Sequence, residues 1–344
     1  MDTRFVVVRS ASLLGYVDLA RSVGLDPLAM LRKVGLSASS LEDPEALLSA
    51  EAASELLEAS AAASGVEDFG LRLASLRKLS NLGPISLVLR EESSARQALD
   101  TLCRYLSLLN AALIAQIDEH EGLITIREQV LLQHSSPTRQ ATEISVGVLY
   151  RTLAELLGTT WKPVRVCFAH RAPSNVKRHT AFFGTRVTFN AEFSGMVCKA
   201  TDLQRHLHGD SPEMARFARQ YLDRALSRQP QSPQAIVRQL IAALLPSGRC
   251  TSQRVAQHLG VDRRTIHRQL TSEGESFSRL LQSIRAELAL RQVRESELPL
   301  AEVAALLGFA SHSAFSHWFS TTFGRTAAEL RRDRASTEAS MKIG

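Results

Sequence analysis

Basic and polar side chains recur at helical spacing in the last third of the chain. Arg263, Arg264, His267 and Arg268 lie within one short segment, SQRVAQHLGVDRRTIHRQL. Arg264 and Arg268 are four residues apart, so on a helix they project from the same face. An arginine side chain can donate two parallel hydrogen bonds to a phosphate or to the edge of a guanine. The pattern therefore predicts a helix face that contacts nucleic acid.

A cysteine and a histidine in the segment VRVCFAH could act as a nucleophile and its base. Cys167 lies three residues before His170, and a thiol beside an imidazole is the arrangement of a cysteine nucleophile. The alternation in this segment is typical of a strand, on which His170 shares one face with Val164, Val166 and Phe168. Cys167 then points to the other face. We interpret the segment as packing and predict no enzymatic activity.

A second group of polar side chains has the types of metal ligands. Its members are Cys198, His206, His208 and Asp210, and cysteine, histidine and aspartate all bind zinc. The group lies in a polar stretch next to a helix start, which favours a solvated loop. The glycines before it stand singly and form no phosphate-binding loop. We therefore predict no metal and no cofactor.

The composition is that of a water-soluble chain. The 344 residues are 44% hydrophobic and 22% charged, and no apolar run approaches the ~18 residues of a membrane helix. The four cysteines form no CxxC pair, so neither a disulfide framework nor a zinc finger is indicated. The brief apolar run at the amino end is too short for a signal peptide. These features predict a cytoplasmic protein without a membrane partner.

The net charge of +6 is concentrated in the carboxyl-terminal third. From Pro233 onward there are 15 Lys and Arg against 10 Asp and Glu, while the preceding part holds 26 against 25. A basic module joined to a nearly neutral one indicates a polyanion partner for the basic module. The neutral part shows no sign of a second nucleic-acid surface.

Two prolines in the polar run QPQSP separate these two parts, because proline is not tolerated inside a helix. Helical spacing is found on both sides of the run and at 48–63, 95–109 and 139–157, and strand patterns at 123–127, 164–170 and 185–190. The order of these elements predicts an α+β amino-terminal domain and an all-α carboxyl-terminal domain. The predicted bounds are a sensing and dimerisation domain at 1–228, a linker at 229–233, a DNA-binding domain at 234–334 and a tail at 335–344.

The segment SQRVAQHLGVDRRTIHRQL has a second copy further along the chain. EVAALLGFASHSAFSHWF repeats the apolar positions of the first copy 48 residues later before the turn and 49 residues later after it. Each copy predicts a helix, a glycine at positive φ and a second helix, whose N-caps are Asp262 and Ser311. This is the layout of a helix-turn-helix, in which the second helix enters the major groove of DNA. The candidate DNA-binding residues are Arg263, Arg264, His267, Arg268, His312, Ser313, Ser316 and His317.

A long helix connects the two copies. The segment Phe277–Val293 places Leu280, Leu281, Ile284 and Leu288 on its buried side, together with Ala289 and Val293. Its 17 residues span ~25 Å. Two groove-reading units on one face of DNA stand ~34 Å apart. The connector and the offsets of the two units from its ends match that separation.

The carboxyl-terminal part resembles the DNA-binding domain of the AraC/XylS family of transcription regulators. The text that carries the resemblance is GESFSRLLQSIRAELALRQV, LAEVAALLGFASHSAFSHWFSTTFG and RTAAELRR. The resemblance implies a DNA-binding transcription factor that inserts two recognition helices per protomer into successive major-groove segments. Two positions depart from the family pattern. Ala327 replaces a usual proline, so the last helix is expected to start less sharply, and His317 replaces a frequent arginine, which weakens a guanine contact.

The amino-terminal part resembles the arabinose-binding-type sensor domain of one branch of this family. The matching text is GLDPLAMLRKVGL, FGLRLASLRKLSNLGPISLVLR and WKPVRVCFAHRAPSNVKRHTAFFG. The resemblance implies recognition of a small-molecule effector and homodimerisation through this domain, without making arabinose the effector. Three functions stay open: an effector-controlled regulator, a DNA-tethered enzyme and a constitutive DNA binder. The sequence leaves open the effector, the operator, activation or repression, and RNA polymerase as a further partner.

Overall fold

A computed structural model describes residues 6–132, 136–207, 209, 211–229, 233–245 and 250–333. The chain divides into two compact units. The main division in the sequence falls between Gln229 and Pro230, and the short segment Ala169–Arg171 groups with the second unit. Within the described ranges, no helix combines the length and the apolar character that a membrane crossing requires. The first unit mixes helices and sheet and the second contains helices, so the predicted fold class is confirmed.

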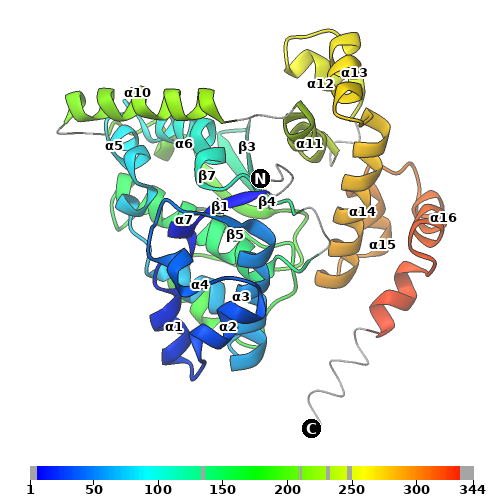
Figure 1. Ribbon diagram of the computed structural model, residues 1–344, viewed down its shortest axis with the longest axis horizontal. Helices are drawn as coiled ribbons and strands as arrows, with labels where there is room; N and C mark the ends of the chain where they lie inside the picture. The colour runs from blue at the N-terminus through cyan, green and yellow to red at the C-terminus, as the bar shows by residue number, and fades with distance from the viewer. Residues whose placement is uncertain are drawn as a thin grey trace. The chain divides into compact units, whose positions relative to one another are not determined.

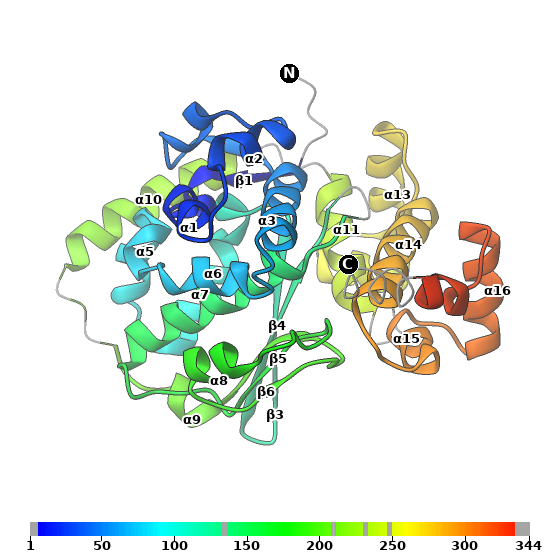
Figure 2. The same ribbon diagram turned by 90° about the horizontal axis from the view of Figure 1, so that it is seen from below.

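The first unit contains ten α-helices among its described residues (Figures 1 and 2). They are α1 (Tyr16–Ser22), α2 (Pro27–Lys33), α3 (Ala50–Ser64), α4 (Phe69–Ser75), α5 (Pro84–Arg90), α6 (Ala95–Leu109), α7 (Arg139–Leu157), α8 (Lys177–Phe183), α9 (Ala200–Leu203) and α10 (Pro212–Arg228). Three 3₁₀ turns are η1 (Ser10–Leu13), η2 (Ala38–Leu41) and η3 (Leu79–Leu82). The starts of α3 and α6 are fixed by side chains, because Ser49 and Ser94 each accept a hydrogen bond from a backbone N–H of the first turn.

Two sheets complete the first unit. The strands are β1 (Val7–Arg9), β2 (Leu47–Ser49), β3 (Leu113–His120), β4 (Leu123–Val130), β5 (Arg165–Cys167), β6 (Val187–Thr188) and β7 (Ser194–Lys199). The first two strands form an antiparallel pair, and the others form a sheet in the order β3-β4-β7-β5-β6. Only β5 and β6 run parallel within the described part of that sheet. The helix α7 packs on β4 and β7.

The core of the first unit forms where helices cover the sheet. Ile124, Ile126 and Met196 on the strands are buried together with Leu153 of α7. Trp161 joins this cluster, where its ring stacks on Tyr150 at 6.2 Å between centroids. A neighbouring cluster buries Ala218 and Leu222 of α10 against α5 and α6 (Figure 1). The helix α10 therefore belongs to the packed body of the first unit.

One detail of the strand prediction is wrong. Val164 and Val166 were predicted to share one face of a strand over 164–170, but the exposed fraction of Val164 is 43% while Val166 is fully buried. The strand β5 begins only at Arg165 and ends at Cys167, so regular alternation does not extend to Val164 or to His170. Cys167, which was predicted on the opposite face of the strand from Val166, is buried as well. Both faces of this short central strand are thus covered.

The second unit is built around one long helix. Its elements are α11 (Pro233–Leu244), α12 (Ser252–His258), α13 (Arg263–Ser272), α14 (Phe277–Glu295), α15 (Leu300–Leu306), α16 (His312–Phe323) and a short helix at 327–333. Figure 1 shows α12 and α13 near the start of α14, and α15 and α16 beside its later turns. The helix α14 carries the buried side expected from the sequence, although Leu281 is only half-buried and Glu287 joins the buried set.

Candidate nucleic-acid interface and amino-terminal pocket

The first helix pair of the second unit ends in a helix with an outward basic face. Gly260 turns the chain at φ 64° between α12 and α13, a conformation that favours glycine. Asp262 then caps α13 by accepting a hydrogen bond of 2.7 Å from the backbone N–H of Thr265. Ile266 and Leu270 are buried and hold α13 to its neighbours. The predicted cap, glycine turn and inward residues are all confirmed.

The remaining side of α13 exposes every candidate residue predicted on it. Arg263, Arg264, His267 and Arg268 are all exposed. In the described chain, no carboxylate lies within ion-pair distance of Arg263, Arg264 or Arg268. An arginine without a carboxylate partner keeps its donors available for an external acceptor. The face can therefore bind phosphates or base edges.

The second helix pair repeats this construction. Gly308 turns the chain at φ 71°, and Ser311 caps α16 by accepting a hydrogen bond of 3.1 Å from the backbone N–H of Ala314. Phe315 and Phe319 are fully buried in the positions of Ile266 and Leu270. The repeat predicted from the sequence is thus present in the structure as two equivalent helix pairs.

The outward face of α16 is polar but less basic. His312, Ser313 and His317 are exposed, whereas Ser316 is half-buried. The Ser316 Oγ lies 3.4 Å from His312 Nε2, which ties this hydroxyl to its own helix. Of the four candidates on α16, Ser316 is therefore the least available to a partner molecule.

An aromatic cluster fixes α16 in its place. Trp318 packs against Phe309 with ring centroids 5.0 Å apart, and Phe315, Phe319 and Phe323 complete the cluster. The indole Nε1–H of Trp318 also donates a 3.0 Å hydrogen bond to Gln282 Oε1 of α14. Because aromatic packing leaves few alternative rotamers, it fixes the position of the α16 backbone from which the outward side chains project.

The helix α14 connects the two helix pairs. Its 19 residues correspond to about 28 Å at 1.5 Å per residue. Buried Glu287 in α14 pairs with Arg238 of α11 at 3.1 Å. Near the second pair, the guanidinium of Arg285 lies 5.2 Å from the ring centroid of Phe309 and donates to the Leu307 carbonyl at 3.1 Å. These contacts tie α14 to α11 and to the second helix pair.

The last helix of the unit has a defined start despite the missing proline. Ala327 is buried at its first position. The Thr326 N–H donates to Glu329 Oε2 at 2.7 Å, and the Glu329 N–H donates to Thr326 Oγ1 at 3.2 Å. This reciprocal pair is a capping box. It compensates for the departure from the family pattern, so the expectation of a less sharp start is wrong.

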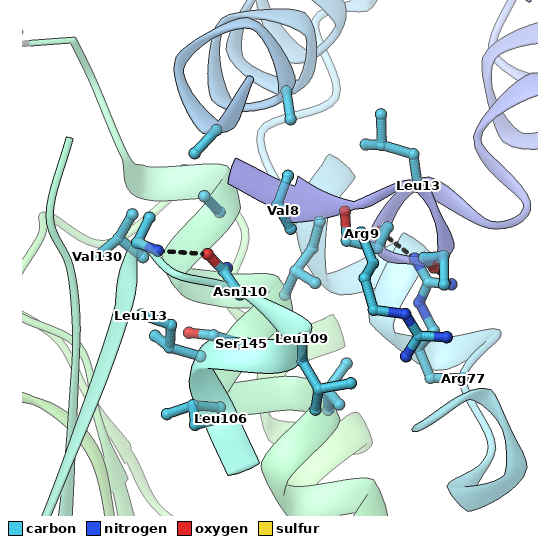
Figure 3. A pocket seen from close by; sticks show the side chains of 18 of the residues that line it. Val8, Arg9, Leu13, Arg77, Leu106, Leu109, Asn110, Leu113, Val130 and Ser145 are labelled. Carbon is cyan, nitrogen blue, oxygen red and sulfur yellow. Dashed lines mark hydrogen bonds between the residues drawn. The ribbon is translucent and has the colours of Figure 1, made fainter. Parts of the chain in front are cut away.

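The first unit contains a mainly apolar pocket of ≈ 160 Å³. Its wall comes from β1, η1, α3, η3, α6, β3, β4 and α7, and most of its side chains are aliphatic. Figure 3 shows Arg9 and Arg77 on one side of the pocket and Leu113 and Val130 on the other. A pocket of this kind, apolar with a few polar groups, is the usual form of a small-molecule site.

Three buried ionisable side chains contribute to the pocket wall. They are Arg9, Arg77 and Glu128. Burial lowers the pKa of the Arg77 guanidinium to about 10. Burial also raises the pKa of the Glu128 carboxyl to about 7, an effect that a hydrogen bond with Ser145 partly offsets. Sequence reasoning missed these residues, although Glu128 gave one signal: in LITIREQV it alternates in phase with Ile124, Ile126 and Val130, which places a carboxyl on an apolar strand face.

The two alternative sites considered from the sequence gain no support. Burial raises the pKa of the Cys167 thiol, which disfavours the thiolate that a nucleophile requires. His170 Nδ1 lies 2.9 Å from the Arg171 carbonyl oxygen. Of the metal candidates, His208 and Asp210 lie outside the described residues, and the described residues contain no cluster that could hold a metal ion.

Comparisons with known proteins agree with this architecture. A model described as the arabinose-binding domain of AraC transcription regulator matches residues 24–207, and a helix-turn-helix model matches residues 255–333. The HTH-type transcriptional regulator VirS of Mycobacterium tuberculosis is 29% identical over 328 residues, which cover 94% of this chain and 96% of VirS. The ornithine utilization regulator of Pseudomonas aeruginosa is 23% identical and covers 92% of this chain and 93% of its own length.

Among solved structures, the transcriptional regulator CdpR from Pseudomonas aeruginosa aligns with 89% of this chain and 96% of its own, at 19% identity and a TM-score of 0.44. The family models together cover both units, and the first of them alone matches more than half of the chain. The chain therefore belongs to the AraC family of DNA-binding transcription regulators, with an amino-terminal domain of the arabinose-binding type.

Proposed function

We propose that this regulator reads its operator with two recognition helices, α13 and α16, under the control of a small organic effector bound in the amino-terminal pocket. The matched setting of the two helices carries the proposal. Each follows a glycine at positive φ, begins at a side-chain cap, buries two apolar residues and turns its polar residues outward. A helix held in this way is suited to enter the major groove.

The spacing of the two helices supports simultaneous reading. The spacer α14 is about 28 Å long, and successive major-groove segments on one face of DNA are ~34 Å apart. Arg264 and Arg268 are the base-reading candidates on α13, and His317 is their counterpart on α16. Because arginine offers a bidentate fork and histidine a single ring nitrogen, α13 carries the larger share of sequence discrimination.

The composition of the pocket favours an effector-controlled regulator rather than a DNA-tethered enzyme. A DNA-tethered enzyme would need titratable side chains that converge on a reacting atom. In the described first unit, the pocket wall is instead dominated by aliphatic side chains, and Arg77 is engaged with the backbone oxygens of Ala11 and Ser12. This chemistry suits reversible binding of a mostly apolar molecule.

The helix α10 supports homodimerisation through the first unit. Met214, Phe217 and Tyr221 lie on one of its faces with exposed fractions of 56%, 64% and 61%. The opposite face is anchored, since Tyr105 donates a 2.6 Å hydrogen bond to Asp223. Three large exposed apolar side chains at this spacing form a patch of the kind found at interfaces.

The occupant of this patch is a second copy of the chain in an antiparallel arrangement. If Phe217 of one copy packs beside Tyr221 of the other, Glu213 of one lies near Arg224 of the other, and the same pair forms twice by symmetry. Opposite charges then meet at both ends of the contact, and the two helix dipoles run in opposite directions. A dimer places two pairs of recognition helices on DNA and raises their effective concentration.

Genomic DNA selection with the full-length protein tests the proposal. The expected result is enrichment of discrete sites. Each half of a site, bound by one protomer, should contain two conserved segments about one turn of the DNA helix apart. Binding of all fragments with equal affinity would contradict sequence-specific reading. The double variant Arg264→Ala/Arg268→Ala should lose this enrichment, while Arg279→Ala, which removes an exposed arginine of α14, should keep it.

A further inference from the structure

Two buried polar atoms in the pocket wall have no hydrogen-bond partner within the described chain. They are Nε of Arg9 and Oε2 of Glu128. The two residues are only 7% and 8% exposed, and both line the pocket. A buried donor or acceptor without a partner costs about 1–3 kcal/mol. A ligand that supplies an acceptor to Arg9 and a donor to Glu128 removes both costs.

The arginine side of the pocket has an excess of positive charge. Arg9 pairs with Glu45, whose side chain is 61% exposed. Arg77 donates to the carbonyl oxygens of Ala11, at 2.7 Å, and Ser12, and within the described residues no carboxylate lies at ion-pair distance from it. Arg9 and Arg77 are two buried positive charges, and the solvent-screened carboxylate of Glu45 offsets only one of them. An anionic group beside Arg9 would offset the other.

The opposite side accepts a hydrogen-bond donor. Glu128 lies on the buried face of β4 between Ile126 and Val130, and Ser145 of α7 lies beside it. No cation of the described chain pairs with Glu128. Desolvation of its carboxylate is therefore relieved by a donor from the pocket, such as a hydroxyl or an ammonium group.

Aliphatic side chains occupy the wall that completes the pocket. They include Leu13, Leu57, Leu106, Leu109, Leu113 and Val148. A ligand that spans from Arg9 to Glu128 must present an apolar body to this wall, because buried polar atoms would find no partner there.

We propose that the pocket takes a mainly apolar organic acid with a hydrogen-bond donor at its far end. The carboxylate binds Arg9, the donor binds Glu128, and the carbon chain packs on the aliphatic wall. The identity of this ligand as the effector rests on the proposed function, whereas its binding does not. The two are measured separately, by calorimetry without DNA and by operator binding with and without the ligand.

Three probe compounds with the same carbon number separate the contributions of the groups. We expect 8-hydroxyoctanoic acid to bind the full-length protein more tightly than octanoic acid, and octanoic acid more tightly than octan-1-ol. The hexanoic and decanoic analogues test the length of the chain. If octan-1-ol binds as tightly as the hydroxy acid, or if no acid of the series binds, the proposed ligand class is wrong. Operator binding that persists in that case leaves the DNA-reading function intact.

Matched variants locate the two contacts. Arg9→Gln should weaken binding of octanoic acid about ten- to a hundred-fold, as expected for loss of a charge-assisted hydrogen bond. Glu45→Gln removes the other half of the same ion pair but leaves Arg9 free for the ligand, so binding should be unchanged or tighter. Equal weakening by both variants would show a purely structural role for the ion pair and overturn the proposal.

The contact at Glu128 is read from the difference between two probes. The advantage is the ratio of the affinity for 8-hydroxyoctanoic acid to the affinity for octanoic acid. Glu128→Gln should lower this ratio by a smaller factor than Arg9→Gln lowers the affinity for octanoic acid, because glutamine still accepts one hydrogen bond. Glu128→Leu should abolish that advantage, and persistence of the full advantage would overturn the assignment. Thermal unfolding without ligand checks each variant, and Arg9→Lys, which keeps the charge, replaces Arg9→Gln should the latter not fold.

Discussion

Thr326 and Glu329 cap one another: the N–H of each residue donates to a side-chain oxygen of the other, at 2.7 Å and 3.2 Å. These bonds satisfy two of the backbone donors that a helix start leaves unpaired. The last helix of the second unit therefore obtains a fixed start from side chains, with Ala327 rather than a proline at its first position.

Removal of this cap should destabilise the second unit. Thr326→Ala deletes the hydroxyl that accepts from the Glu329 N–H, and loss of an N-cap costs about 1 kcal/mol. Thr322→Ala, at an exposed position inside α16, is the matched control and should change little. Urea unfolding followed by circular dichroism measures the difference, and equal stability of the two variants would show that the cap contributes nothing.

Sequence discrimination should depend more on α13 than on α16. Arg268→Ala should lower specific operator affinity by about 1–3 kcal/mol at fixed salt, while non-specific affinity falls less. His317→Ala should cost less, because one imidazole makes a weaker contact, and His317→Arg should tighten binding. An equal loss of specific and non-specific affinity for Arg268→Ala would identify Arg268 as a phosphate contact.

The stability of the first unit should fall as pH rises through the range in which Glu128 titrates. Its pKa is raised from 4.5 to about 7, so between these values the folded protein keeps a proton that the unfolded chain has lost. Stability is then greatest below pH 4.5 as far as this group is concerned, and about 3 kcal/mol is lost once the pH exceeds about 7.

Glu128→Gln removes this titration. The free energy of unfolding of the variant, minus that of the original protein, should increase by about 3 kcal/mol when the pH is raised from about 5 to about 8. Of the charged groups that line the pocket, Arg9, Arg77 and Lys78 remain in both proteins, so their contributions cancel in the comparison. Urea unfolding at the two pH values measures it, and parallel pH profiles would contradict a raised pKa at Glu128.

Disruption of the apolar face of α10 should separate the proposed dimer. Phe217→Glu introduces a charge at the centre of the patch, where burial of an unpaired carboxylate is costly. Leu47→Glu is a matched control, because Leu47 and Phe217 have the same exposed fraction of 64%. Sedimentation should show a monomer for Phe217→Glu only, with weaker operator binding. A monomeric original protein would exclude this interface.

The helix pairs of the second unit could be predicted because their signals are local. A cap, a glycine and two apolar residues lie within about ten positions of one another in each copy, and the repeat confirms each signal twice. Asp262 and Ser311 cap the helices in which the sequence placed them. The buried ion pair between Arg238 and Glu287 escaped prediction, since no local pattern relates residues on different helices.

The first unit was harder to predict because its contacts are remote in sequence. The hairpin of β3 and β4 turns at Glu121 and Gly122, both at positive φ, and glutamate is an unusual residue there, so β3 was missed. The pocket gathers Arg9, Arg77 and Glu128 from three distant segments. Nothing in the spacing of these residues indicates that they meet, and only the phase of Glu128 within its strand hinted at a buried carboxyl.

The packing of Trp318 makes its intrinsic fluorescence a probe of the second helix pair. The indole is the residue after His317, half-buried among phenylalanines and bonded to Gln282. The chain has only one other tryptophan, Trp161 in the first unit. In a Trp161→Phe background, fluorescence therefore reports α16 alone, and a stopped-flow trace on mixing with DNA times the step at which the proposed function has this helix bind.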